Sequence, residues 1–423
     1  MRNVSICATS CNNEKVKNKL SDFEFLFFMF ISIYYLLPAV SSAIPFILIL
    51  FVCITYTCCL WLLNRKEATF YLTILVIAMF VSLIYFLFTS SATVDQGVSN
   101  YGLKRILSKF EQVFMSFFPI IMFLEIQKKA SYAQKKWLLV VIGVLLTYVL
   151  INTMVELSVN ESATKSWADF DEQSEKNVGT YSYVYAVPIL FVSLPYLFVQ
   201  MKNSFLKFLI VGVGIFLFSF LLLAQYTLAL LIAIIGLVLQ ISFNIKSNKT
   251  KIILWLCCIL VFLVLPTILD YLATHVPSEQ MAIRLQEIAS FFGKGDASGY
   301  NLNGRLTLYG KAIKAFLRSP IIGNRSLGFS GHATFLCVFA DIGILGGGIF
   351  FYLYFLSRKK VDDNLGRSKR AFAAVFISLL LMGFTNPIHS AFSLSFIVWM
   401  VVPLLIVCIN NKKEKDNETP LGN

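Results

Sequence analysis

Residues 44–63 read IPFILILFVCITYTCCLWLL and contain no charged side chain. At about 1.5 Å per residue, a helix of this length covers the roughly 30 Å of a bilayer's hydrocarbon core. Similar runs recur along the chain, which has 57% apolar residues, 14% charged residues and a mean hydropathy of +0.74. A soluble domain carries about 25% charged residues. The sequence therefore predicts an all-α polytopic membrane protein and excludes a water-soluble globule.

Apolar runs alternate with charged breaks along the chain, and this alternation predicts twelve transmembrane helices in a single integral membrane domain, residues 1–423. The predicted spans are 24–40, 44–63, 68–89, 108–126, 137–156, 181–200, 205–223, 226–243, 252–269, 333–356, 371–387 and 392–410. The first run also fits a signal peptide, because Ala39-Val40-Ser41 and Ser41-Ser42-Ala43 resemble a small-residue cleavage site after an apolar segment. Removal of that segment would leave eleven spans.

Positive charge is distributed unequally over the predicted loops. The chain has 36 Lys and Arg residues against 23 Asp and Glu residues, a net charge of +13. If the N-terminus is cytoplasmic, the inward loops and termini hold 24 of the 36 basic residues, whereas the long outward loops hold 11. Because Lys and Arg resist translocation, this asymmetry predicts that both termini are cytoplasmic. The membrane topology thus accounts for much of the excess of positive charge, and no nucleic-acid partner is expected.

Most of the sequence outside the predicted spans lies in two outward loops. One is an acidic loop, residues 157–180, and the other is a long loop, residues 270–332. All three histidines, His275, His332 and His389, fall on the same side. We therefore expect the function to reside on the exported face. The acidic loop is either a solvated segment or a lid that selects the substrate.

Within the long loop, residues 304–318 have the spacing of an amphipathic helix on the membrane surface. The apolar face consists of Leu306, Tyr309, Ile313, Phe316 and Leu317, and the basic face consists of Lys311, Lys314 and Arg318. Arg305 starts at the edge of the apolar face, where a guanidinium needs an anionic partner. That partner is either a structural carboxylate or lipid headgroup, or a phosphate that the planar guanidinium binds in bidentate fashion.

Ser319-Pro320 ends this helix, and His332 then precedes the next predicted span. A histidine at a helix N-terminus lies beside free N–H groups that favour an anion, and an imidazole pKa near neutrality suits a general base. The alternative is a structural histidine that caps the helix. Asp341 lies about nine residues, or roughly 13 Å, further along the span, and we expect it to have a partner inside the bundle.

Five segments of this region resemble a known signature. They are Gly304-Arg305, Ala312-Ile313-Lys314-Ala315-Phe316, Ser319-Pro320-Ile321-Ile322-Gly323, Gly331-His332-Ala333-Thr334-Phe335-Leu336 and Asp341-Ile342-Gly343-Ile344-Leu345-Gly346. In order and residue type they resemble the signature region of bacterial O-antigen polymerases and ligases, over about forty residues, 304–346. The predicted number of spans and the loop placement are compatible with this superfamily.

The resemblance implies a fold like that of the GT-C glycosyltransferases, in a multi-pass protein of the bacterial inner membrane whose active face is periplasmic. It implies a glycosyltransferase that acts on oligosaccharides carried by undecaprenyl pyrophosphate. It also implies that Arg305 binds the pyrophosphate and that His332 lies near the reacting sugar. Arg284, which precedes Gly295 at the spacing described for polymerases, and Arg325 are further candidates for binding pyrophosphate.

Two further residues are candidates for substrate binding. His389, in Asn386-Pro387-Ile388-His389-Ser390, lies on the same predicted side as His332 and either lines the glycan site or belongs to an ordinary turn. Asp341 is the second candidate.

The chain contains no P-loop and no metal-ligand triad at recognised spacing, so we expect a reaction without metal or cofactor. Direct displacement is expected to invert the configuration at the anomeric carbon.

The chain departs from the family pattern at two places. Relatives commonly have Ser-Arg where this chain has Ala224-Gln225-Tyr226-Thr227, and they have Asn where Ala333 follows His332.

A repeat-unit polymerase is the first hypothesis, and a ligase that transfers glycan to the lipid A core is the second. A lipid-linked oligosaccharide flippase is the third, although a transporter does not need a 63-residue exported loop. The resemblance alone implies a polysaccharide chain-length regulator as a partner.

Overall fold

The computed structural model describes residues 20–63, 67–89, 102–160, 163–164, 174–276, 282–283, 285–286, 289, 300–324 and 333–418. For residues 86, 88–89, 102–105, 262, 300–305, 367 and 411–418 it describes the backbone only. Every regular element within these stretches is a helix, which confirms the predicted all-α class.

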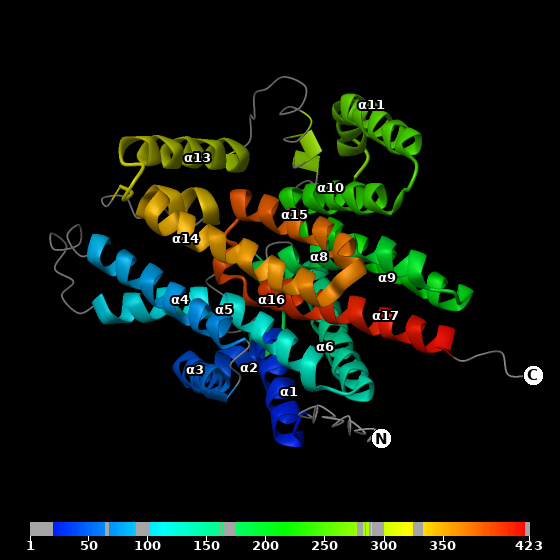
Figure 1. Ribbon diagram of the computed structural model, residues 1–423. Helices are drawn as coiled ribbons and strands as arrows, with labels where there is room; N and C mark the ends of the chain where they lie inside the picture. Colours follow the sequence, from blue (N-terminus) through cyan, green and yellow to red (C-terminus); the bar gives the residue numbers. More distant parts are fainter. Residues whose placement is uncertain are drawn as a thin grey trace, which may run out of the picture.

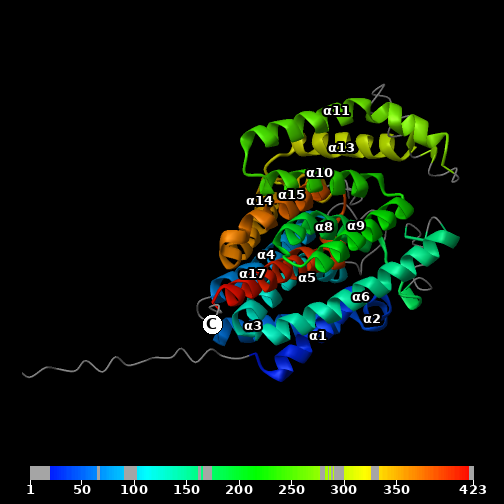
Figure 2. The same cartoon turned by 90° about the vertical axis from the view of Figure 1, so that its right-hand side faces the viewer.

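The helices form one layered bundle. They are α1 (Asp22–Leu36), α2 (Pro38–Ala43), α3 (Phe46–Leu63), α4 (Ala68–Thr89), α5 (Gly102–Lys129), α6 (Tyr132–Val159), α8 (Tyr181–Gln200), α9 (Ser204–Ala224), α10 (Thr227–Asn244), α11 (Asn248–Ala273), α13 (Tyr300–Arg318), α14 (Thr334–Leu365), α15 (Lys369–Thr385), α16 (Phe392–Phe396) and α17 (Val402–Glu418). Two short 3₁₀ turns, η2 (Gly366–Ser368) and η3 (Ile388–Ser390), lie between helices, and the π-helical segment η4 (Ile397–Val401) joins α16 to α17. Figure 1 shows α1, α2 and α3 along one side of the bundle and α11 and α13 along the opposite side. The same order of layers is visible after a quarter turn in Figure 2.

Nine helical segments of the described chain are long and apolar enough to cross a membrane, and the bent helix α11 gives a tenth if its two halves form one span. Each of the twelve predicted ranges is largely helical in the structure. The first range, 24–40, is not one helix, because Leu37 is extended before Pro38 and separates α1 from α2. The two ranges that do not meet the length of a span correspond to α1, with 15 residues, and α15, with 17 residues. The protein is therefore a polytopic membrane protein in a lipid bilayer, and the count of twelve spans stays a prediction.

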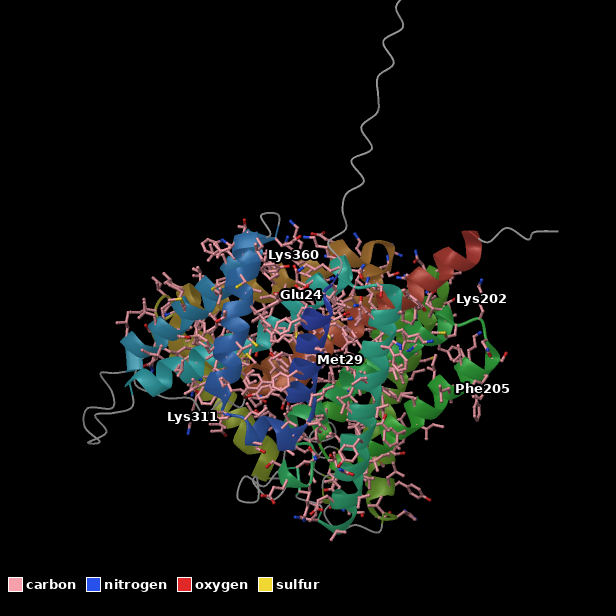
Figure 3. All side chains as sticks on the ribbon, turned by 90° about the horizontal axis from the view of Figure 1, so that it is seen from below. Glu24, Met29, Lys202, Phe205, Lys311 and Lys360 are labelled. Atoms are coloured by element: carbon pink, nitrogen blue, oxygen red, sulfur yellow. The ribbon has the colours of Figure 1, made fainter. Side chains whose placement is uncertain are left out.

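The bundle has two ends with different chemistry. At the first, α8, α10, α14 and α16 begin and α15 ends, and we call it the Thr334 end. At the second, α5 ends and α1 and α4 begin, and we call it the Lys129 end. Figure 3 shows Glu24, Lys202 and Lys360 toward the Lys129 end and Lys311 toward the opposite one. Under the predicted topology the Lys129 end is cytoplasmic.

A buried ionic network joins three helices at the Lys129 end. Lys129 Nζ lies 2.8 Å from Glu125 Oε2 on the same helix and 2.9 Å from Glu24 Oε1 on α1. Tyr71 Oη of α4 donates to Glu125 Oε1 at 2.5 Å. The Glu125 side chain is fully buried, and a carboxylate in such a place is stable only when it is paired and hydrogen-bonded. The network therefore fixes α1, α4 and α5 against one another.

Helix α14 is interrupted at Gly343. This residue has φ +64° and ψ −166°, a conformation that is essentially restricted to glycine. The interruption frees backbone groups that an intact helix would pair, and the turn formed by residues 320–324 pairs them instead. Three hydrogen bonds do so: Ile344 N to Pro320 O at 2.8 Å, Leu345 N to Ile321 O at 3.1 Å and Asn324 N to Ala340 O at 2.7 Å. A broken helix is tolerated at membrane depth when protein satisfies its backbone in this way.

The turn and the interruption approach at backbone distance because each contains a glycine. Gly323 has φ +78°, and a Cβ at this position would collide with the backbone carbonyl of Asp341. A Cβ on Gly343 would collide with the backbone carbonyl of Ile321. The turn follows α13 directly, so this contact fixes the end of α13 against the middle of α14.

Helix α13 is the amphipathic helix predicted over residues 304–318, and it packs on α14 mainly through small side chains. Ala312 and Ala315 are buried against α14, because alanine allows two helices to approach closely. Three large side chains of the predicted apolar face are exposed: Leu306 (46%), Ile313 (47%) and Leu317 (68%). An exposed apolar stripe that is flanked by exposed lysines is typical of a helix at a membrane surface.

Gly343→Ala is expected to destabilise the protein, because the added Cβ needs an unfavourable φ and collides with Ile321. Backbone strain of this kind costs about 1–3 kcal/mol, so we expect a lower midpoint of thermal unfolding in detergent. Gly310→Ala in α13 is the matched control, because no described atom lies within 4 Å of its Cβ position and alanine is preferred to glycine inside a helix. Equal midpoints for the two variants would contradict the close contact at Gly343.

Candidate functional site

The Thr334 end is organised around the connection between α15 and α16, residues 386–391. The connection begins at Asn386, whose side chain is fully buried, and it contains the single turn η3. Asn386 has an extended backbone, φ −144° and ψ 160°, because the following Pro387 excludes it from a helical conformation. The pair Asn386-Pro387 therefore ends α15 and starts the connection.

The first residue of α14 is bound to this connection through both its backbone and its side chain. Thr334 N donates to Asn386 O at 3.1 Å, and Thr334 Oγ1 donates to the same carbonyl at 3.2 Å. Thr334 Oγ1 also lies 3.0 Å from His389 Nδ1. The Thr334 hydroxyl and the imidazole therefore share a hydrogen bond, whose donor depends on the tautomer of His389.

Helices α5 and α8 also hold the connection. The hydrogen bonds that join them to it include Ser116 Oγ to His389 O at 2.9 Å, Tyr185 Oη to Asn386 Oδ1 at 2.6 Å, and one between Tyr181 Oη and Ser390 Oγ at 2.7 Å. The ring of Tyr185 lies edge-on to that of Tyr226 at the start of α10, with centroids 5.7 Å apart. Side chains from three helices therefore fix the path of the connection, and aromatic rings lie beside it.

Helix α13 reaches the same place through Tyr309. Tyr309 Oη donates at 2.8 Å to the backbone carbonyl of Thr385, the last residue of α15. Arg305 precedes Tyr309 by four residues and so belongs to the same face of α13. The backbone of Arg305 lies in α13, and its side chain is outside the described atoms.

The acidic loop is described at residues 157–160, 163–164 and 174–180. Its last part is tied to the bundle, because Gly179 N donates to Thr153 Oγ1 at 2.7 Å and Ala39 N donates to Asn177 Oδ1 at 3.1 Å. Thr164 O accepts a hydrogen bond from Tyr226 Oη at 2.9 Å. These described parts of the loop are therefore anchored close to the aromatic side chains of the Thr334 end.

His389 is neutral at physiological pH. Burial lowers the pKa of its imidazole to about 3, and the cation of Lys109 on α5 lowers it further. Lys109 Nζ donates to Gln112 Oε1 at 3.1 Å and lies 5.1 Å from the centroid of the Tyr85 ring. The neutral imidazole has one nitrogen that donates and one that accepts a hydrogen bond, and it is not a cationic partner for a phosphate.

Two of the predicted site residues are described in full. His389 belongs to the network around Thr334, and Asp341 lies two turns after Thr334, directly before the interruption of α14, with its side chain partly buried. The structure brings His389 to the start of α14 and leaves Asp341 further along the helix. The other predicted residues, His332, Arg284 and Arg325, lie outside the described residues, as does the side chain of Arg305.

Several residues of the network were not predicted from the sequence. Thr334 and Ser116 carry no sequence signal, because a hydroxyl residue in a transmembrane helix often bonds to a carbonyl of its own helix. Tyr185 is one of 18 tyrosines in a chain rich in aromatic residues, so its type alone does not distinguish it. Asn386-Pro387 does carry a turn signal, and that signal could have identified Asn386.

Comparison with known protein families finds no family that matches the chain, and comparison with curated proteins finds no match either. The arrangement itself combines hydroxyl groups, a buried amide, a neutral imidazole and aromatic rings at one end of a membrane bundle. Hydroxyl and imidazole groups both donate and accept hydrogen bonds, and aromatic rings offer flat apolar faces. In the described residues these groups bond to one another, so the network holds the start of α14 and the connection together.

Thr334→Val keeps the shape of the side chain but removes the hydroxyl that joins α14 to Asn386 and His389. A buried polar group left without its partner costs about 1–3 kcal/mol, so we expect a lower midpoint of thermal unfolding in detergent. Thr147→Val is the control, since Thr147 is exposed and its hydroxyl donates to Gly143 O of its own helix. If both variants unfold at the same temperature, the Thr334 hydroxyl does not hold the two segments together.

The lowered pKa of His389 predicts that the fold is sensitive to acid. The unfolded chain binds a proton at this residue below about pH 6.5, whereas the folded protein binds it only near pH 3. Stability therefore falls as the pH decreases from about 6.5, and above about pH 7 His389 makes no pH-dependent contribution. His389→Asn, whose amide replaces Nδ1, is expected to reduce this loss, measured as the unfolding midpoint between about pH 7.5 and 5. A difference between wild type and variant that is constant over this range would argue against the lowered pKa.

Proposed function

We propose that the protein is a repeat-unit polymerase for lipid-linked glycans, of the O-antigen polymerase type, in a bacterial inner membrane. It transfers a growing glycan from undecaprenyl pyrophosphate to the next lipid-linked repeat unit. The reaction takes place on the periplasmic face, which is the Thr334 end under the predicted topology with both termini in the cytoplasm.

The convergence of α13 and α14 on the connection between α15 and α16 supports this proposal. Tyr309, one turn after Arg305, and Thr334, two residues after His332, are hydrogen-bonded to consecutive residues at the start of that connection. The described residues of the two signature segments, Tyr309 and Thr334, are therefore held by neighbouring carbonyls. In the sequence, Arg305 precedes Tyr309 by four residues and His332 precedes Thr334 by two.

The proposed reaction is a direct displacement. The acceptor hydroxyl attacks the anomeric carbon, the bond from that carbon to the pyrophosphate oxygen breaks, and the configuration inverts. His332 takes the hydroxyl proton as the general base. Arg305, with Arg284 and Arg325, stabilises the negative charge of the departing pyrophosphate, so the displacement needs no metal in this scheme.

His389 and Asp341 contribute to glycan binding in this scheme. The neutral imidazole of His389 forms a hydrogen bond with a sugar hydroxyl at Nε2, while Nδ1 remains on Thr334. Asp341, deeper along α14, accepts hydrogen bonds from hydroxyl groups that enter the bundle. A chain-length regulator in the same membrane is the proposed protein partner.

The test uses the purified protein in liposomes that contain undecaprenyl-pyrophosphate-linked repeat units. The expected product is a ladder of lipid-linked polymers on a gel, formed without nucleotide sugars. Glycan transferred only to added lipid A core would identify a ligase. Movement of the units across the bilayer without new glycosidic bonds would identify a flippase and overturn both enzyme functions.

Arg305→Ala and His332→Ala are expected to lower polymer formation by at least about a hundredfold, because a general base and a charge stabiliser each contribute about 10²-fold or more. Arg318→Ala, exposed at the end of α13, and His275→Ala, exposed beyond α11, are the matched controls and are expected to retain activity. The amount of each variant in the membrane is measured by immunoblot. Wild-type product from Arg305→Ala or His332→Ala would remove that residue from the mechanism.

A further inference from the structure

Helix α5 contains two glutamates with opposite surroundings. Glu125 is fully buried, paired with Lys129 and hydrogen-bonded to Tyr71. Glu111 is partly exposed, its carboxylate oxygens are not enclosed by protein, and among the residues that the structure describes it forms no ion pair and no hydrogen bond. A carboxylate in a transmembrane helix is costly without a partner, and such residues commonly handle a substrate or an ion. Glu111 can therefore accept hydrogen bonds from a ligand.

Glu111 lies at the Thr334 end of the bundle. It precedes Lys129 by 18 residues of one continuous helix, about 27 Å at 1.5 Å per residue, which is close to the roughly 30 Å of the hydrocarbon core. It also precedes Ser116 by five residues, and the Ser116 hydroxyl donates to the carbonyl of His389. Under the predicted topology, the carboxylate is therefore near the outward boundary of the membrane, on the side of the proposed reaction.

The end of α1 faces this part of α5. Tyr35 Oη donates to the carbonyl of Met115 at 2.6 Å, and Met115 follows Glu111 by one helical turn on the same face. The charge of Glu111 acts on the hydroxyl groups of both Tyr34 and Tyr35. Glu24, labelled in Figure 3, marks the Lys129 end of α1, so the two tyrosines lie at the opposite end of that helix. A carboxylate and two phenol rings therefore lie together where α1 ends.

Tyr34 provides a second polar group that is available to a ligand. The residue is 6% exposed, and its hydroxyl is accessible and has no hydrogen-bond partner among the described residues. Its ring lies edge-on to that of Tyr35, with centroids 6.2 Å apart. The phenol hydroxyl is therefore held in place by packing and not by a hydrogen bond of its own.

Lys109 is directed away from Glu111. It lies two residues earlier in α5, about 200° around the helix. Its amine donates to Gln112 and lies over the ring of Tyr85 on α4. The negative charge of Glu111 therefore remains available to a ligand.

The chemistry of Glu111 and Tyr34 indicates the class of ligand. A carboxylate has two acceptor oxygens, and a phenol hydroxyl both donates and accepts, so the pair matches adjacent hydroxyl groups of a sugar ring. A metal ion would need several ligands like Glu111, and no group of three metal-ligating side chains occurs in the described part of the chain. An acidic sugar would be repelled by the carboxylate. The pair therefore favours an uncharged sugar.

We propose that Glu111 and Tyr34 form a subsite for one uncharged sugar ring of the lipid-linked glycan. The carboxylate of Glu111 accepts hydrogen bonds from two adjacent ring hydroxyls, and the hydroxyl of Tyr34 forms a third. Glu111 binds and orients the sugar and takes no part in proton transfer. The subsite rests on the proposed function, because the glycan that it binds is the substrate of the proposed polymerase.

Glu111→Gln keeps the shape of the side chain but removes its charge and one acceptor oxygen. Loss of a charge-assisted hydrogen bond weakens binding by about tenfold or more. In the liposome assay, we expect KM for the lipid-linked repeat unit to rise at least about tenfold, with kcat within about twofold of the wild type. Tyr34→Phe is expected to raise KM at least about threefold. An unchanged KM in Glu111→Gln, or a lower kcat at unchanged KM, would overturn the subsite.

Glu156→Gln and Tyr148→Phe on α6 are the matched controls. Glu156 lies near the outward end of α6, 3.9 Å from the exposed Lys176, and Tyr148 is 48% exposed. Both variants are expected to retain the KM of the wild type, and an equal rise would overturn the subsite. The unfolding midpoint of Glu111→Gln is expected to be no lower than that of the wild type, since no partner in the described part of the chain is lost. A lower midpoint would assign Glu111 a structural role instead.

A binding measurement separates the subsite from the proposed activity. The full-length protein in liposomes is treated with a hydrophobic carbodiimide, which adds to accessible carboxyl groups, and the modified fraction of Glu111 is measured by mass spectrometry. The lipid-linked repeat unit is expected to protect Glu111 at least about threefold, whereas undecaprenyl pyrophosphate without glycan is not. Equal protection by both lipids, protection by neither, or no modification of Glu111 at all would overturn the subsite.

The two measurements fail independently. Protection of Glu111 by the repeat unit in a protein that forms no polymer would overturn the polymerase function and leave the sugar subsite in place. Polymer formation without protection would do the reverse.

Discussion

The backbone contact between residues 320–324 and the interruption of α14 is the constraint on which the Thr334 end depends. An interrupted helix inside a membrane exposes N–H and C=O groups, each of which costs several kcal/mol in hydrocarbon unless protein pairs it. Here the turn after α13 supplies the partners. Gly323 and Gly343 are both required because no Cβ fits between the two backbones. As a result, the end of α13 is fixed against α14, although the two are separate helices.

Much of the fold could be predicted from the sequence, because a bilayer permits few alternatives to a long apolar helix. Hydropathy located the long apolar helices of the bundle, and periodicity located α13. The interruption of α14 was not predicted. Gly343 provides a backbone conformation that other residues rarely adopt, and the sequence does not show which glycine of the helix adopts it. Its partner, the turn at 320–324, is a tertiary contact, which local periodicity cannot reveal.

The candidate site could be predicted only in part, for a related reason. Its histidines and arginines stand out in an apolar sequence, and the structure places one of them, His389, beside the first residue of α14. Its protonation state follows from burial and from Lys109, which comes from a helix far away in the sequence. Thr334 and Asn386 position the connection, yet a threonine or asparagine in a sequence gives no indication of the partner that it will find. Residue type can suggest chemistry, but the network depends on the packing of several helices.

The ionic network at the Lys129 end also bears on the order of events during biosynthesis. Glu125 and Lys129 are four residues apart on α5, so this helix enters the bilayer with its buried carboxylate already neutralised. Glu24 precedes Lys129 by 105 residues, so the ion pair between α1 and α5 forms only after α5 has been synthesised. Helix α1, only 15 residues long, therefore depends for this contact on a later helix of the same chain.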